Sequence, residues 1–166
     1  NRGAVTTVAN ATLGLMAAIQ LKKRRKGKYA LMPSFTFPAT ALAAIWCGLE
    51  PYFIDISIDD WYMDKTVLLD KIEELKEEVA IVIPYATFGS WMNLEKYEEL
   101  EKKGIPVVVD AAPGFGLMNG GMHYGQDFSG MIVYSFHATK PFGIGEGGLI
   151  YSKNEEDIQH IKRMGN

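Results

Sequence analysis

Short apolar runs alternate with amphipathic stretches along most of the chain. Three of the runs are Val79–Ile83, Ile105–Val109 and Gly130–Tyr134, and each has the length of a strand but no polar face. The stretches between the runs, such as Asp64–Glu78, place apolar residues at helical spacing. A strand that is apolar on both faces needs helices on both sides of its sheet. The sequence therefore predicts an α/β protein, a three-layer α/β/α sandwich with a mostly parallel sheet.

The expected elements follow one another in this alternating order. Helices are expected over Ala11–Arg25, Ala39–Cys47, Asp64–Glu78, Leu94–Lys103 and Glu155–Met164. Strands are expected over Tyr29–Met32, Tyr52–Ile56, Val79–Ile83, Ile105–Val109, Gly130–Tyr134 and Gly148–Tyr151. No internal repeat, linker or change of composition interrupts the pattern, so the 166 residues are expected to form one domain.

Charge and composition narrow the range of partners. The net charge of −3 gives no reason to expect binding to nucleic acid. The basic residues Lys22–Lys26 and Lys28 are either the solvated end of a helix or a patch for a phosphate or polyanion. No apolar run is long enough to span a bilayer and no signal-peptide pattern is seen, so we expect a cytoplasmic protein with no membrane partner.

The remaining single residues point away from disulfides and metals. Cys47 is the one cysteine and lies among apolar residues, so it is expected in the core. His123 and His137 do not have the tight spacing to acidic residues that a metal site requires, so no metal is expected.

Two apolar strands are each followed by one charged residue, Asp110 and Lys140. Ligands of open α/β sheets bind at the carboxyl ends of the strands, so Asp110 is either a site residue or a turn-former at the surface. Lys140 has apolar neighbours, where an amine loses its proton more easily and becomes a nucleophile. The alternative is a structural lysine paired with Glu146 or Asp127. Brought to one sheet edge, the carboxylate and the amine could hold opposite ends of one cofactor.

The segment Gly143–Gly148 formally matches the dinucleotide-binding pattern G-x-G-x-x-G. That pattern works only when a strand leads into it and a helix leads out, so that the helix N-terminus meets the pyrophosphate. Here Leu149–Tyr151 reads as a strand, and a lysine and a proline separate the glycines from the preceding strand. We therefore reject the dinucleotide-binding interpretation.

Other candidates could complete a binding site. Asn10 or Thr12 could cap the first helix, or the start of that helix could bind a phosphate, with Ser135 as a second contact. Phe37 is either a core residue or an aromatic ring that stacks on a flat ligand.

Six short motifs share an order and a spacing that resemble one known family. They are NATLGL at Asn10–Leu15, PSFTFPAT at Pro33–Thr40, TFG at Thr87–Gly89, VVDAA at Val108–Ala112, SFHATK at Ser135–Lys140 and GEGG at Gly145–Gly148. In this respect the chain resembles the DegT/DnrJ/EryC1/StrS family of pyridoxal-phosphate enzymes, the sugar aminotransferases of fold type I. The matching motifs span nearly the full chain.

The resemblance implies a role for each candidate residue toward pyridoxal 5'-phosphate. Lys140 would bind the cofactor covalently, and Asp110 would pair with its ring nitrogen. Phe37 would stack on the ring, and the phosphate would be held by Thr12, Leu13 through its backbone amide, and Ser135. Pro113 departs from the family, which commonly has glutamine or histidine there near the ring oxygen, because proline has no donor to offer.

The resemblance also implies an activity. The family moves an amino group from an amino acid, usually glutamate, to a keto group of a nucleotide-linked sugar in polysaccharide or sugar biosynthesis. Residues 1–166 would form the cofactor-binding large domain, without the extreme N-terminal segment and the small C-terminal domain of the family's longer chains, and a homodimer partner would complete the site. The alternatives are a non-catalytic regulatory or binding relative and a sugar dehydratase. Lys140 argues against the dehydratases that carry histidine at this position.

Overall fold

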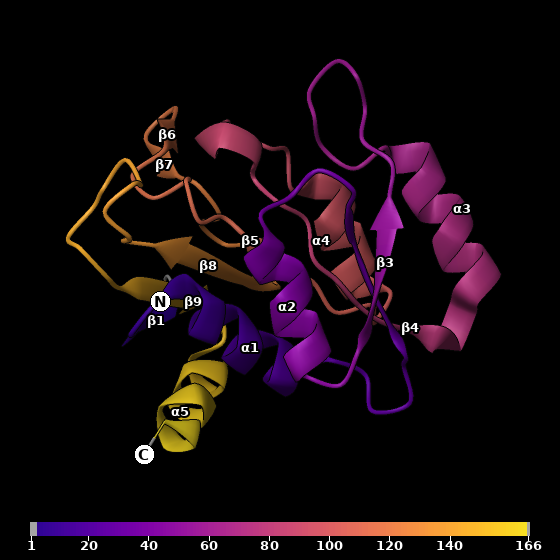
Figure 1. Cartoon of the computed structure of the whole chain (residues 1–166), viewed down its shortest axis with the longest axis horizontal. Coiled ribbons are helices and arrows are strands. Elements are labelled where there is room, and N and C mark those ends of the chain that lie inside the picture. Colours follow the sequence, from indigo (N-terminus) through magenta and orange to yellow (C-terminus); the bar gives the residue numbers. More distant parts are fainter. Residues whose placement is uncertain (1–2, 166) are drawn as a thin grey trace.

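A computed structural model describes residues 3–165 and has the predicted α/β architecture in three layers (Figure 1). A four-stranded sheet in the order β1-β9-β8-β5 lies beside a three-stranded sheet in the order β3-β2-β4. Parallel bridges from Val82 to Val107 and from Tyr85 to Asp110 join the two. The strands are β1 (Ala4–Val8), β2 (Tyr29–Pro33), β3 (Glu50–Ile54), β4 (Val79–Val82), β5 (Val108–Asp110), β8 (Met131–Ser135) and β9 (Gly148–Ser152).

Most strands of this layer run in the same direction. β2 pairs in parallel with β3 and β4, and β5 pairs in parallel with β8, whereas β9 is antiparallel to both of its neighbours, β1 and β8. The carboxyl ends of β2, β3, β4, β5 and β8 therefore lie along one edge of the sheet, where a ligand site is expected. A separate hairpin consists of β6 (Met118–Asn119) and β7 (Met122–His123).

Helices bury both faces of the sheet in two distinct cores. One core contains side chains of α1 (Ala11–Lys22), α2 (Pro38–Trp46) and α5 (Glu155–Met164), and the other contains side chains of α3 (Lys65–Leu75) and α4 (Glu95–Lys102). Successive residues of β5 alternate between them, since Val108 lies in the first core and Val109 in the second. This two-sided burial explains why the strands have no polar face.

The predicted elements are all found, with ends that differ by a few residues. The largest shifts are of three residues: α1 stops at Lys22 instead of Arg25, α3 stops at Leu75 instead of Glu78, and β5 begins at Val108 instead of Ile105. The side chain of Lys23 donates to the carbonyl of Cys47 and that of Arg24 to the carbonyl of Gly104, so these two basic residues tie the helix end to neighbouring loops. Cys47 is buried, as predicted.

The sequence analysis missed β1 and the β6–β7 hairpin. β1 has the sequence AVTTV, alternates between half-buried and exposed residues and lies at the sheet edge, so it lacks the apolar run that marked the other strands. The hairpin strands have two residues each and are exposed, which leaves no pattern to detect. Among residues 3–165, no helix combines the length and the apolar character needed to cross a bilayer.

The N-terminus of α1 is packed tightly against the sheet. A Cβ atom on Gly148, the first residue of β9, would lie 2.9 Å from the carbonyl oxygen of Tyr134 and 3.0 Å from the amide nitrogen of Ala11. A Cβ on Gly14 would come within 3.0 Å of the Val133 side chain. Glycine at these two positions lets α1 begin directly beside the carboxyl end of β8.

Candidate active site at the carboxyl ends of the strands

Asp110 ends β5 and is almost fully buried, with 2% of its surface exposed. Its Oδ2 accepts a hydrogen bond of 2.6 Å from the hydroxyl of Thr40, in the first turn of α2, and its Oδ1 accepts one of 3.1 Å from the amide of Ala112. The Thr40 hydroxyl also lies 2.8 Å from that of Thr36, with either group able to donate. Asp110 is therefore a fixed, buried carboxyl and not a solvated turn residue.

The environment of Asp110 shifts its titration. Burial raises the pKa of the Asp110 carboxyl above its usual range, because the charged form loses its hydration. The hydrogen bonds from Thr40 and Ala112 and the positive charge of Lys140 act in the opposite direction and offset part of this effect. A cationic ligand group beside the carboxyl would favour its ionised form further.

Lys140 lies in the loop that joins β8 to β9. Its Nζ is 5.6 Å from the centroid of the Phe37 ring, and that ring has 61% of its surface exposed. The structural alternative, an ion pair with Glu146 or Asp127, is not formed within residues 3–165. Instead, Glu146 lies 3.6 Å from Nε2 of His137. Lys140 and Phe37 thus face one another, and among residues 3–165 the amine forms no ion pair.

The candidates for a phosphate site come from α1 and β8. Asn10 caps α1, and its Oδ1 accepts from the amide of Leu13 at 2.9 Å. Ser135 ends β8, is buried, and pairs across the sheet with Gly148, where an added Cβ would lie 3.0 Å from the amide nitrogen of Ala11. Thr12 is half-buried in the same first turn. Thr12, Leu13 and Ser135 therefore lie around one helix N-terminus.

The glycine loop connects two antiparallel strands and does not open a helix. Within it, the amide of Ala138 donates to the carbonyl of Gly145, and the amide of Ile144 donates to that of Phe136. Gly148 then begins β9. This agrees with the rejection of the dinucleotide-binding interpretation.

Thr40 is the residue of this site that the sequence analysis did not single out. Its position in the motif PSFTFPAT was noted, but only the fold shows that this hydroxyl reaches a carboxylate 70 residues further along the chain. Threonine is common at helix starts, so the residue type of Thr40 gave no signal.

Pro113 lies against a second loop of the same edge, since a Cβ on Gly89 would be 2.4 Å from the carbonyl oxygen of Pro113.

Replacing Thr40 with valine is expected to destabilise the protein through Asp110. Valine keeps the shape of the side chain but removes the donor to Oδ2, so the pKa of Asp110 should rise further. The loss in the free energy of unfolding should be about 1–3 kcal/mol at neutral pH. It should be smaller in acid, where the carboxyl is protonated. Urea denaturation at the two pH values measures both effects, and Thr40→Ser, which keeps the hydroxyl, is the control. Equal losses for Val and Ser would contradict the assigned hydrogen bond.

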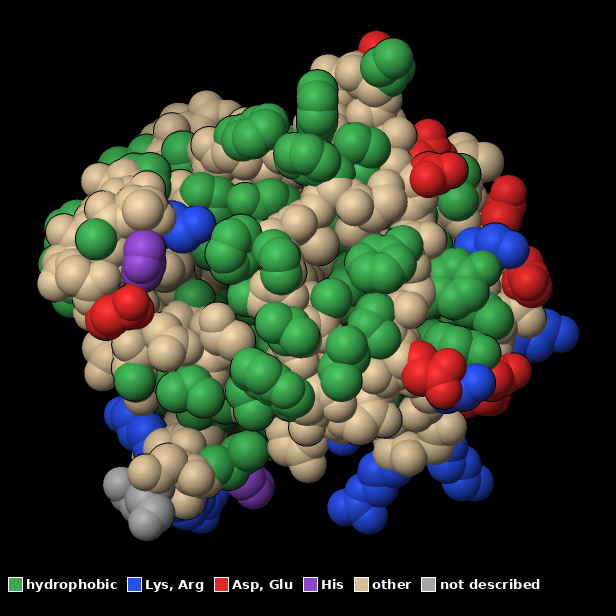
Figure 2. Space-filling model, viewed as in Figure 1, with side chains coloured by type: hydrophobic (Ala, Val, Ile, Leu, Met, Phe, Trp, Pro, Cys, Tyr) green, Lys and Arg blue, Asp and Glu red, His purple; other side chains and the backbone are tan. Residues whose placement is uncertain are grey.

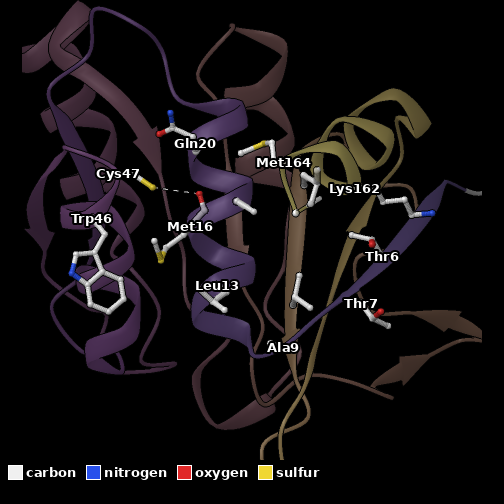
Figure 3. A pocket seen from close by; sticks show the side chains of 14 residues that line it. Thr6, Thr7, Ala9, Leu13, Met16, Gln20, Trp46, Cys47, Lys162 and Met164 are labelled. Carbon is white, nitrogen blue, oxygen red and sulfur yellow. Dashed lines mark hydrogen bonds between the residues drawn. The ribbon is translucent and has the colours of Figure 1, made fainter.

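The hollow that runs beside α1 is separate from this arrangement. It has a volume of about 840 Å³ and is lined by side chains of β1, α1, α2 and α5 (Figure 3). Met16, Trp46 and Met164 give it an apolar lining, and the Cys47 thiol donates to the carbonyl of Met16 at 3.3 Å. Of the predicted site residues only Leu13 borders it, so its walls offer none of the acid–base groups found at the strand ends.

The sequence profile of the DegT/DnrJ/EryC1/StrS aminotransferase family matches residues 2–166. The chain belongs to this family. Asp110 and Lys140 both lie within the residues that this profile matches.

Several known proteins are similar to this chain over almost its whole length. The Mycobacterium tuberculosis protein Rv3402c is 35% identical over 98% of this chain and 40% of its own length. The GDP-perosamine synthase of Escherichia coli O157:H7 is 28% identical over 96% of this chain and 44% of its own length. A crystal structure of a Bacillus cereus protein assigned as a PLP-dependent aminotransferase superposes with a TM-score of 0.99 at 95% identity, over all of this chain and 45% of the other. The chain thus spans less than half the length of these relatives.

Proposed function

We propose that the protein is a pyridoxal-phosphate-dependent aminotransferase that moves an amino group from an amino acid, glutamate, to a keto group of a nucleotide-linked sugar. The observation that carries this proposal is the set of three groups at one sheet edge: the buried carboxyl of Asp110, the amine of Lys140 and the ring of Phe37 beside that amine. Similarity to the GDP-perosamine synthase of Escherichia coli O157:H7 supports a nucleotide-linked sugar as the substrate.

The residues present fit pyridoxal phosphate. The cofactor has a basic ring nitrogen, a flat aromatic ring, an aldehyde and a phosphate. Asp110 offers a buried carboxyl for the nitrogen, Phe37 an exposed ring face, and Lys140 an amine with no acidic partner among residues 3–165. When bound, the cofactor withdraws electrons from the carbon that carries the substrate's amino group.

Asp110 is proposed to keep the ring nitrogen protonated. A buried carboxylate that is ionised needs a cation nearby, and a protonated ring nitrogen supplies one. Thr40 and the amide of Ala112 hold the two oxygens in fixed positions, so the carboxylate does not have to reorient when the ligand enters.

Lys140 is proposed to bind the cofactor and, once released from it, to move a proton with Nζ as general base. Its Nζ lies 5.6 Å from the centroid of the Phe37 ring, so a flat ligand stacked on that ring would lie close to the amine. Thr12 and Ser135 are proposed to hold the phosphate at the start of α1, where the helix dipole favours an anion. The Leu13 amide already donates to Asn10, so a phosphate bound there has to share that donor or replace the acceptor.

The proposal extends to the assembly and location of the protein. Residues 1–166 would form the cofactor-binding domain, and the site would be completed in a homodimer. Exposed apolar side chains on α1 and α2, among them Leu13, Ile45 and Trp46, support such an interface. Figure 2 shows hydrophobic side chains gathered over these two helices. A cytoplasmic location fits the single buried cysteine, since disulfides are uncommon there.

A panel assay tests the proposed reaction. The purified protein should turn yellow with pyridoxal phosphate, lose that colour on addition of glutamate, and regain it with one or more keto-sugar nucleotides. Alanine and aspartate serve as alternative amino donors, and free keto sugars serve as controls for the nucleotide. Protein that stays colourless would favour a non-catalytic relative with the same fold. The observation that favours this alternative is Pro113, which has no hydrogen-bond donor to offer the cofactor. Release of a dehydrated sugar without amine transfer would favour the dehydratase.

A further inference from the structure

Three aromatic side chains form a cluster at the sheet edge that carries the candidate site. The ring centroids of Phe35 and Trp61 are 5.1 Å apart, those of Phe35 and Phe88 are 5.7 Å apart, and those of Trp61 and Phe88 are 6.0 Å apart. All three rings are exposed, and Phe88 most of all, at 73%. We call Phe35, Trp61 and Phe88 the aromatic platform.

The platform is assembled from three separate loops. Phe35 follows β2, Trp61 lies between β3 and α3, and Phe88 lies in the turn Thr87–Gly89 after β4. The loop that carries Trp61 projects beyond the carboxyl edge of the sheet (Figure 1), and hydrophobic side chains gather at this edge in Figure 2. β2 and β3 run parallel to β4, and β4 is joined to β5 by parallel bridges, so the platform lies on the same sheet edge as Asp110.

The backbone at two of the three rings is strained. Trp61 has φ of 63° and Phe88 has φ of 55°, a left-handed conformation that large side chains rarely adopt. The hydroxyl of buried Thr87 donates to the carbonyl of Trp61 at 3.1 Å and so fixes one loop to the other. The strained backbone costs free energy, and the two exposed rings that it positions, Trp61 and Phe88, do not repay that cost by packing in the core. Strain of this kind concentrates at ligand sites.

We infer that the aromatic platform binds the nucleobase of the nucleotide-linked substrate. Exposed aromatic rings bind bases by stacking, because every base has a flat π face. The exposed residues Asp59 and Asp60 directly precede Trp61, and their negative charge disfavours phosphates there but not an uncharged base. The segment Phe35-Thr36-Phe37 connects the platform to the ring beside Lys140, so one extended ligand can reach both. This inference rests on the proposed function, since it assigns one part of that substrate.

Binding of nucleoside diphosphates tests the platform without any turnover. We would titrate the purified protein with UDP, GDP, dTDP and pyrophosphate, and follow both heat and tryptophan fluorescence. One or more of the nucleotides should bind more tightly than pyrophosphate and quench the fluorescence, and the quenching should be reduced in Trp61→Phe. Phe88→Ala should weaken that binding about tenfold or more, the usual effect of losing one stacked ring.

Two variants separate stacking from general damage. Phe88→Tyr keeps the ring and should bind like the unchanged protein, and so should Phe53→Ala, which removes an equally apolar exposed ring from β3 outside the platform. The inference is overturned if Phe88→Ala binds nucleotides normally or if pyrophosphate binds as tightly as they do. It is also overturned if Phe88→Ala alters only the oligomeric state. Uptake of pyridoxal phosphate, read from the yellow absorbance, is measured separately. If the protein does not take up pyridoxal phosphate, the proposed function is contradicted. Whether the aromatic platform binds a nucleobase is decided by the nucleotide titration alone.

Discussion

Replacing Lys140 with alanine is expected to abolish half-transamination with glutamate. The amine of Lys140 faces the Phe37 ring with no acidic partner among residues 3–165, and no neighbouring residue in its loop offers a second primary amine. The cofactor could still be retained by its phosphate and ring contacts, but it would have no covalent bond and no base for the proton transfer. Loss of the absorbance change on glutamate addition, followed in a stopped-flow experiment, measures the effect.

Two further variants make the Lys140 experiment specific. Lys140→Arg keeps the positive charge but cannot supply a neutral amine, so it should be as inactive as the alanine variant. Lys153→Ala removes an exposed lysine at the end of β9 and should leave the reaction unchanged. Activity retained in Lys140→Ala would show that another lysine carries the cofactor.

Replacing Asp110 with asparagine is expected to reduce the rate of half-transamination by about a hundredfold or more, the order of magnitude for losing one preorganised charged partner. Asparagine has nearly the same shape and can still accept from Thr40, but it brings no negative charge to a ring nitrogen. The measured quantities are the rate at saturating glutamate and the affinity for pyridoxal phosphate. A variant with unchanged rate would remove Asp110 from the proposed site.

The same substitution should change how stability depends on pH in the cofactor-free protein. The folded-state pKa of Asp110 is raised by burial, so the folded protein binds this proton more tightly than the unfolded chain does. This tighter proton binding contributes to the free energy of unfolding at low pH, and the contribution is lost as pH rises through the folded-state pKa of Asp110. Asp110→Asn cannot lose it, so its free energy of unfolding relative to the unchanged protein should increase over that pH range. A constant difference across pH would contradict the raised pKa.

The fold was predictable because its strands are buried on both faces. Runs such as Val79–Ile83 had to lie between two helical layers, and the structure distributes their residues between the two cores. β1 escaped prediction because an edge strand that alternates half-buried and exposed residues, without an apolar run, resembles a loop. The early end of α1 could not be foreseen either, since it depends on acceptors in two distant loops, the carbonyls of Cys47 and Gly104.

The site was predictable only in part for a related reason. Asp110 and Lys140 follow recognisable strands, so their place at the sheet edge could be inferred from the chain alone. Thr40 and the aromatic platform depend on contacts between segments far apart in the sequence, and their residue types are common in turns and cores. The structure was also needed to show that the amide of Leu13 already donates a hydrogen bond to the side chain of Asn10.

Chemical trapping of the cofactor tests the central proposal most directly. Purified protein is incubated with pyridoxal phosphate, reduced with borohydride and digested, and the modified peptide is identified by mass spectrometry. The account predicts one stable modification, on Lys140, in a protein that was yellow before reduction. It also predicts that Lys140→Ala shows no such modification. Colourless protein with no trapped cofactor, or cofactor fixed to a lysine elsewhere, would contradict it.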